Sequence, residues 1–244
     1  TVRLFLRRRK ADYWGGFNLV YRALRDKNGE LSAIGTDDAG YESLVMLESD
    51  TGELLSDLDG NRDRLQEHLV LARAMVQDFK PMVRAVQRAE ESCLAVADAR
   101  PDQADAMRET AAFLKWLVHE NFVFMGLDDG TQSLGIQTVE NPRYQSDKSG
   151  SWAKPHAPDT VRVRKSQVES PIHRAGRIDE ILVTVGDEND PHAVQLFLRG
   201  MFTYRAVTQP SRNVPILRRV VASILEEQST GPGSFRYKGI ANVF

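Results

Sequence analysis

The sequence predicts an α+β fold of mostly antiparallel sheets with helices packed on one face, arranged in two modules. Three observations predict it. Polar and apolar residues alternate through the first sixty residues, the apolar spacing becomes that of a helix from Leu65, and strand patterns return after residue 121. Because strands and helices are grouped rather than alternating one by one, antiparallel sheets are expected.

The first module opens with short strand patterns separated by turns. Val2 to Leu6 reads as a first strand, and residues 17–24, 31–34 and 41–47 read as three more. Lys27-Asn28-Gly29 is a turn signal, because Asn and Gly tolerate positive φ. These segments together predict an antiparallel sheet.

A long helix follows, and a proline divides it. Apolar residues recur three or four positions apart from Leu65 to Cys93, which is the spacing of one helical face. Pro81 lacks an amide hydrogen and crowds the preceding turn. We therefore expect the helix to kink or split near Phe79.

The module boundary is placed near residue 100, so that residues 1–100 hold the first sheet and the kinked helix and residues 101–244 form a second α+β domain. A helix is expected after Pro101, which suits a first turn. The last helix is expected to begin with Asn213 as its N-cap and Pro215 in its first turn. Four further strands are predicted at residues 122–127, 161–168, 178–185 and 194–207.

The charge and composition exclude several classes of partner. The 244 residues carry 32 Lys and Arg against 34 Asp and Glu, a net charge of −2, so the chain total supplies no attraction for nucleic acid. No uncharged apolar stretch approaches the ~18 residues of a membrane span, so no membrane association is expected. A single cysteine, Cys93, cannot form an internal disulfide. A reducing, cytoplasmic location is therefore expected.

Both ends of the chain resemble internal segments. The sequence begins at Thr1, directly before a predicted strand, and ends at Phe244 in an apolar segment with no polar tail. We therefore expect a piece of a longer protein.

The spacings required for catalysis or metal binding are missing from the sequence. Gly15-Gly16 and Gly231-Pro232-Gly233 lack the strand–turn–helix context of a nucleotide-binding loop. The five histidines show no helical metal-ligand spacing, and Cys93, on an apolar helix face, is expected to be an inert core thiol. His119, at a predicted helix end, is expected to be a capping or surface residue rather than a catalytic base. No catalytic residue, metal or cofactor is predicted for this segment.

One basic stretch is a candidate ligand site. Arg162 and Arg164 point to the same face of their predicted strand, and a short following segment can fold back beside them. Guanidinium groups match carboxylate or phosphate oxygens, so a small anion or amino acid is the expected ligand class. The candidate ligand-binding residues are Arg162, Arg164, Lys165, His173 and Arg174.

A solvated strand face is the alternative explanation of this stretch. Asp179, Glu180 and Glu169 are close enough in sequence to neutralise the cations internally. If the strand pairs with its neighbours, Arg199 or Arg205 can join the face that carries Arg162 and Arg164. Both explanations stay open at the level of sequence.

Four ordered segments resemble the large bacterial NAD-specific glutamate dehydrogenases. The segment FLKWLVHENFVFMG, residues 113–126, resembles that family's "FLxWLxxxxFxFLG". Residues 164–174, with RKS followed by SPIHR, resemble its "KS…S.VHR". LRGMFT at 198–203 resembles "FLGLFT", although Arg199 departs from the pattern, and RNVPILRRV at 212–220 resembles "RDIPLLRRKV".

The resemblance implies more than the residues alone show. These motifs lie in the N-terminal, non-catalytic part of that family, which is built of ACT-like and PAS-like modules. Residues 1–100 would then be an ACT-like remnant with its long helix, and residues 101–244 a PAS-like or ACT-like domain. The catalytic core with its NAD site would lie downstream. The implied partners are the rest of the polypeptide, further copies in a homo-oligomer and an anionic or amino-acid effector.

Three function classes remain. The first is a regulatory and assembly segment of a large NAD-dependent glutamate dehydrogenase, whose whole enzyme would oxidatively deaminate L-glutamate to 2-oxoglutarate. The second is a stand-alone sensor of an amino acid or another anion. The third is a structural interaction domain without a ligand.

Overall fold

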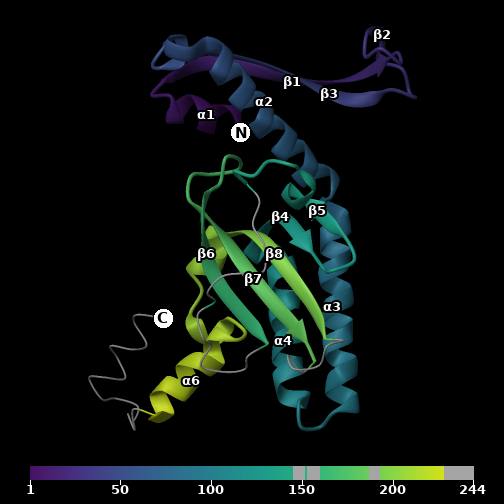
Figure 1. The fold of residues 1–244 in the computed structure, drawn as a ribbon, viewed down its shortest axis with the longest axis vertical. Helices are drawn as coiled ribbons and strands as arrows, with labels where there is room; N and C mark the ends of the chain where they lie inside the picture. Colours follow the sequence, from purple (N-terminus) through teal and green to yellow (C-terminus); the bar gives the residue numbers. More distant parts are fainter. Residues whose placement is uncertain (145–151, 153–159, 187–192, 228–244) are drawn as a thin grey trace. The chain divides into compact units, whose positions relative to one another are not determined.

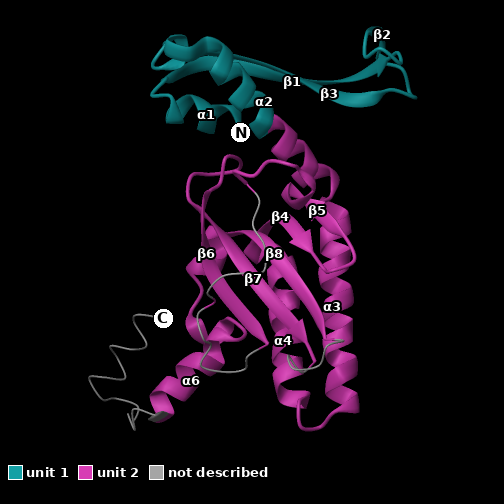
Figure 2. Ribbon diagram, in the orientation of Figure 1, with its two compact units in different colours: residues 1–68 teal, residues 69–244 magenta. Residues whose placement is uncertain are grey.

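The computed structural model describes residues 1–144, 152, 160–186 and 193–227 of the chain (Figure 1). The chain divides into two compact units, residues 1–68 and 69–244, coloured teal and magenta in Figure 2. Antiparallel sheets and helices make up both units, so the predicted α+β class is confirmed.

The first unit is built on a three-stranded antiparallel sheet in the order β2-β1-β3. The three strands predicted at residues 17–24, 31–34 and 41–47 are confirmed. Most large apolar side chains of this sheet are exposed, Phe17 and Leu44 among them. The elements of the unit are α1 (Val2–Arg8), β1 (Tyr13–Arg25), β2 (Leu31–Ile34), β3 (Gly40–Ser49), η1 (Leu54–Asp57) and the first part of α2 (Leu58–Gln77).

The strand predicted at Val2 to Leu6 is wrong, because these residues form helix α1. Leu4, Phe5 and Leu6 are all buried. In a strand with one solvated face, successive side chains alternate between the buried and the exposed side, so three buried residues in a row do not fit a strand of that kind. Leucine and arginine favour helices, and a short apolar run cannot distinguish helix from strand by periodicity.

The long helix is divided as predicted. Helix α2 ends at Gln77, and α3 (Phe79–Ala99) begins two residues later. Pro81 occupies the first turn of α3, where its missing amide hydrogen breaks no helical bond. The predicted helix after Pro101 is α4 (Ala104–Trp116), and it lies beside α3 (Figure 1).

The second unit is centred on a five-stranded antiparallel sheet in the order β5-β4-β8-β7-β6. Helices α3 and α4 cover one face, where Val86, Cys93 and Leu114 pack against Ile181 and Leu198 of the sheet. The opposite face carries a second, smaller core that includes Leu71, Ile136 and Ile178. The strands are β4 (Phe122–Asp128), β5 (Ser133–Gly135), β6 (Val161–Glu169), β7 (Arg177–Val185) and β8 (Val194–Phe202).

The C-terminal part of the described chain differs from the prediction in two ways. Strand β8 ends at Phe202 rather than at residue 207, because α5 (Tyr204–Val207) follows with Thr203 as its N-cap. Asn213 does not cap the last helix. It ends a 3-10 turn, η4 (Ser211–Asn213), and α6 (Leu217–Glu227) begins beyond it.

A side chain from α4 performs the capping role that the sequence assigns to Asn213. Glu109 Oε1 accepts a hydrogen bond from the Ile216 backbone N–H at 2.8 Å, and its carboxylate also holds Arg218. Ile216 has a φ of 68°, a left-handed conformation that the following helix does not share. The start of α6 is therefore stabilised by a tertiary contact rather than by a local cap.

The compact units divide the chain earlier than the predicted module boundary near residue 100. Helix α3 belongs to the second unit because its apolar face packs on α4 and on the second sheet. The ACT-like and PAS-like character of the modules stays a prediction. Two predictions fall on residues that the structure does not describe. The prolines and polar residues of 141–159 predict a surface loop, most of which lies outside the described residues, and Gly231-Pro232-Gly233, which predicts the end of the last helix, lies outside them entirely.

Candidate functional site

The basic strand of the sequence analysis is β6, and its register with β7 shows which side chains share a face. Arg162 lies opposite Leu182 and Arg164 opposite Glu180, so the two arginines point to one face of the sheet as predicted. Lys165, one residue further, points to the other face.

Two buried carboxylates neutralise part of this stretch. Arg164 Nε lies 2.7 Å from Glu180 Oε2, and Lys165 Nζ lies 2.6 Å from Asp179 Oδ1. Asp179 also accepts a hydrogen bond from the Phe202 backbone N–H at 3.1 Å. Asp179 and Glu180 are therefore internal partners of the basic strand, as the alternative explanation expects, but both carboxylates are buried rather than on a solvated face.

Arg199 of β8 joins the face that carries Arg164, because Glu180 pairs with both residues across the sheet. Its side chain is fully buried, and burial lowers the pKa of Arg199 to about 10 despite the attraction of Glu180. Nη1 donates to Gln137 Oε1 at 2.8 Å and to the Tyr144 carbonyl at 2.5 Å. Arg205, the other arginine considered, lies on α5 instead.

The guanidinium of Arg199 is incompletely satisfied by the described part of the chain. Its Nε lies 3.4 Å from Glu180 Oε1, within ion-pair range but without hydrogen-bond geometry. Within the described residues, neither Nε nor Nη2 has a hydrogen-bond partner. Buried N–H groups of this kind are costly, since their contact with water is lost without replacement.

The remaining two candidates lie in the connection between β6 and β7. Arg174 Nη2 donates to the Phe202 carbonyl at 2.7 Å. His173 is partly exposed, and desolvation together with the charge of Arg174 lowers the pKa of its imidazole. The five predicted residues therefore do not share one face: two lie on one side of β6, Lys165 on the other, and two in the following turn.

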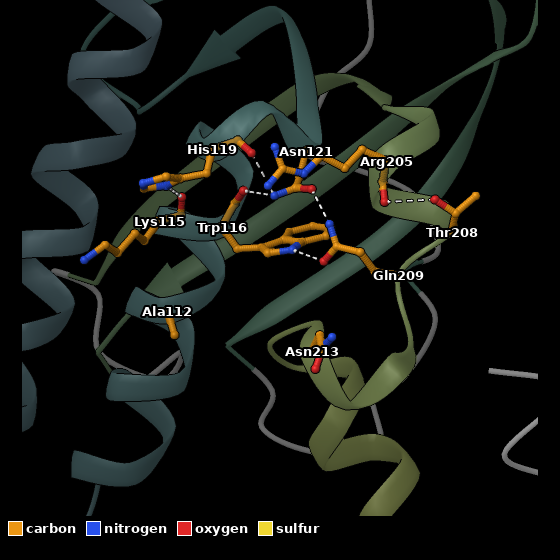
Figure 3. Close-up of a pocket in the computed structure, with 9 residues that line it drawn as sticks. All are labelled: Ala112, Lys115, Trp116, His119, Asn121, Arg205, Thr208, Gln209 and Asn213. Carbon is orange, nitrogen blue, oxygen red and sulfur yellow. Dashed lines mark hydrogen bonds between the residues drawn. The ribbon is translucent and has the colours of Figure 1, made fainter.

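A pocket that the sequence analysis did not identify lies where α4 ends. Its volume is about 570 Å³, within the usual size range of small-molecule sites. Figure 3 shows the Trp116 indole at its centre, with Lys115 and His119 to one side and Arg205, Thr208 and Gln209 to the other. The lining residues are Ala112, Lys115, Trp116, His119, Asn121, Arg205, Thr208, Gln209 and Asn213.

A break in the helix creates this pocket. After α4 the backbone makes a π-helical turn, η2 (Leu117–Asn121), in which Glu120 adopts a left-handed φ of 61°. Thr203 holds this turn in place: its hydroxyl donates to the Glu120 carbonyl at 2.9 Å and its N–H to the Asn121 carbonyl at 3.0 Å. Unusual backbone of this kind persists only where the surroundings hold it.

A chain of hydrogen bonds fixes the polar wall of the pocket. The Trp116 indole Nε1–H donates to Gln209 Oε1 at 3.0 Å, and Gln209 Nε2 donates to Asn121 Oδ1 at 2.7 Å. Asn121 Nδ2 then donates to the carbonyls of Trp116 and His119. Because an indole N–H can only donate, the orientation of both amides follows from this chain.

His119 has the helix-capping role that the sequence predicts. Its Nδ1 lies 2.6 Å from the Lys115 carbonyl oxygen, which can only accept, so Nδ1 carries the proton. No comparable signal in the sequence points to the rest of the pocket. Trp116 and Gln209 are 93 positions apart, and neither belongs to a recognisable motif of binding residues.

Three further sequence expectations concern the reactivity of Cys93, metal binding and the membrane. Burial, and secondarily the charge of Glu90, raises the pKa of the Cys93 thiol to about 12, so this thiol is inert as predicted. The described residues include no group of three or more His, Cys, Asp or Glu side chains placed to hold a metal ion. Among these residues no helix has both the length and the apolar character to cross a bilayer.

Comparison with known proteins confirms the resemblance that the sequence motifs indicate. The chain is 28% identical to the NAD-specific glutamate dehydrogenase of Halomonas elongata, over an alignment of 269 residues covering all of this chain and 17% of that relative. It is 23% identical to the enzyme of the same name from Pseudomonas aeruginosa, covering 16% of that protein. No protein-family model matches the chain. The chain thus spans about one sixth of the curated relatives it matches.

Proposed function

We propose that this chain is an N-terminal regulatory and assembly segment of a large NAD-dependent glutamate dehydrogenase. The observation that carries the proposal is the extent of the similarity: all of this chain aligns, but only about one sixth of each relative is covered. The remaining five sixths leave ample room for a dehydrogenase core. In this proposal the whole enzyme converts L-glutamate to 2-oxoglutarate with NAD in the cytoplasm, and this segment influences that reaction without performing it.

The residues of the chain support a non-catalytic role. The sequence has no glycine-rich turn between a strand and a helix, which a dinucleotide site needs for close approach of the pyrophosphate. The thiol of Cys93 is deeply buried and therefore shielded from substrates. We accordingly assign the NAD site and the reacting groups to another part of the longer protein.

Measurements on the isolated chain, the full-length enzyme and a truncated enzyme test this proposal. The isolated chain should produce no NADH from glutamate above a blank, whereas the full-length enzyme should be active. An enzyme lacking these 244 residues should keep a dehydrogenase core but differ in oligomeric state or in its response to amino-acid effectors. Glutamate-dependent NADH formation by the isolated chain would contradict the proposal. So would a reading frame that encodes no dehydrogenase core, or a truncated enzyme identical to the full-length one.

The second candidate function is anion sensing through the basic strand, with Arg162, Arg164, Lys165, His173 and Arg174 as the binding residues. The unpartnered N–H groups of Arg199 favour it, because an anion on that face would supply the missing acceptors. The test replaces Arg162 and Arg164 with Gln and compares stability in sulfate and chloride. Sulfate stabilises most proteins by exclusion, so an equal gain in variant and parent would exclude this site.

A further inference from the structure

The pocket at the end of α4 differs in charge from the basic strand, because no acidic residue lines it. Lys115 and Arg205 contribute positive charges, His119 contributes an imidazole, and the other lining residues are neutral. Arg205 Nη1 is already paired with Glu120 Oε2 at 3.1 Å. Lys115 has no ion pair with any described residue. Its ammonium points away from the Trp116 indole in Figure 3, but the side chain is exposed and can turn toward a bound ligand.

The floor of the pocket is an indole held in a fixed position. The Trp116 ring stacks on Phe113, with 5.9 Å between ring centroids and 22° between planes, and contacts Phe202 at 6.1 Å. Its N–H is fixed by Gln209. A ring restrained on several sides offers a flat surface on which another flat group can lie without a large entropy cost.

The polar groups near the indole have limited hydrogen-bonding capacity left. Both N–H groups of Asn121 are occupied by backbone carbonyls, and Gln209 has one N–H remaining after its bond to Asn121. The side chain of Asn213 makes no hydrogen bond within the described residues and adds another donor at the lower edge of the pocket (Figure 3). The remaining N–H of Gln209 and the side-chain amide of Asn213 can each donate a hydrogen bond to an oxygen atom of an acid. His119 adds no donor, because its proton is on Nδ1 and its Nε2 can only accept.

We propose that this pocket binds a small organic anion in which a flat conjugated ring carries a carboxylate or phosphate group. The ring lies on the Trp116 indole. The exposed Lys115 side chain, which points away from the indole in Figure 3, turns so that its ammonium faces the acid group. Charge and flatness are both required, since the site combines an uncompensated cation with an aromatic surface. This inference is independent of the proposed dehydrogenase, because it concerns binding by the 244-residue chain itself.

The indole N–H of Trp116 supplies a direct readout. The chain contains three tryptophans, Trp14, Trp116 and Trp152, so its ¹⁵N–¹H spectrum should show three indole cross-peaks. Trp116→Phe identifies the peak of the pocket. Benzoate and phenyl phosphate are the two anionic probes. The probe that binds with the higher affinity identifies the preferred acid group. At least one should shift the Trp116 peak with saturation, while the Trp14 peak stays in place.

Two matched compounds and two matched variants isolate the contributions of charge and ring. Benzamide keeps the ring of benzoate without its charge, and cyclohexanecarboxylate keeps the charge without a flat ring. Both should bind at least fivefold more weakly than the parent probe. Lys115→Gln should weaken binding about tenfold, whereas Lys80→Gln, the same change at an exposed lysine of α3 outside the pocket, should leave it unchanged.

Each of these comparisons can overturn the proposal. If benzamide binds as tightly as benzoate, the charge of the ligand does not contribute to binding. If cyclohexanecarboxylate binds as tightly as benzoate, stacking on the indole does not contribute. If the Lys115→Gln and Lys80→Gln proteins bind the probe with equal affinity, Lys115 is not part of the binding site. If neither anionic probe shifts the Trp116 peak, the pocket has no affinity for this class. A dispersed amide spectrum for every variant shows that loss of binding is not loss of folding.

Discussion

Replacing Glu109 with Gln should destabilise the second unit by loosening the attachment of α6 to α4. The Glu109 carboxylate, with a side chain only 9% exposed, accepts from Arg218 Nε at 2.8 Å and from Arg218 Nη2 at 2.5 Å, and it also accepts from the Ile216 N–H. Glutamine can keep one acceptor oxygen. Its amide nitrogen would face the Arg218 donor, so the bidentate pair is lost.

The size of the effect follows from the exposure of the two partners. A hydrogen bond to a charged group contributes about 1.5–3 kcal/mol when buried. The Arg218 side chain is 44% exposed, so water can replace part of the lost interaction, and we discount the loss to about 1–2 kcal/mol. For a unit of this size that corresponds to a fall in Tm of roughly 3–6 °C.

The effect should also depend on pH, with a sign fixed by Glu109. Burial tends to raise the pKa of this carboxyl, but the hydrogen bonds from Arg218 and Ile216 and the nearby positive charges outweigh burial and lower it. A group with a lowered folded-state pKa stabilises the protein above its unfolded pKa, and loses that contribution as pH falls through the folded value. The difference in the free energy of unfolding between the parent and the Glu109→Gln variant should therefore have its full size at pH 7 and decrease below about pH 4.

Urea denaturation measures this difference. A Trp14→Phe background removes the fluorescence of the first unit, so the remaining tryptophans report on the second. Glu226→Gln, the same change at an exposed position of α6, is the control and should shift the midpoint little. A Glu109→Gln midpoint equal to that of Glu226→Gln, or a difference that stays constant from pH 7 to pH 3, would refute the reasoning.

Three other substitutions or treatments have defined outcomes. Asn213→Ala should cost less than the ~1 kcal/mol of a lost N-cap, because α6 begins beyond this residue, and the urea midpoint checks it. Cys93 should resist iodoacetamide at pH 8 until urea unfolds the chain, as followed by mass spectrometry, because burial raises its thiol pKa to about 12. Gly200→Ala should lower the urea midpoint sharply, since the added Cβ would lie only 2.1 Å from the Val123 carbonyl oxygen. A midpoint for Gly200→Ala equal to that of the parent would show that the strands can separate at no cost.

Part of the candidate chemistry could be predicted from sequence and part could not. The two-residue period of a strand places Arg162 and Arg164 on one face, and the register confirms it. The same period cannot show that Arg199 becomes fully buried, because burial depends on which strands lie beside β8. The pocket around Trp116 depends on contacts between residues about 90 positions apart, and such contacts leave no periodic trace.

The sequence by itself determined the elements whose signal is local. These are the strands β1 to β4, β6 and β7, the division of the long helix at Asp78 near Pro81, and the buried face that contains Cys93. Only the tertiary structure decided that Val2–Arg8 is a helix and that Glu109, rather than Asn213, stabilises the start of α6. The physical reason is range. Side-chain periodicity and proline geometry act over a few residues, whereas capping by Glu109 acts between segments that only the folded chain brings together.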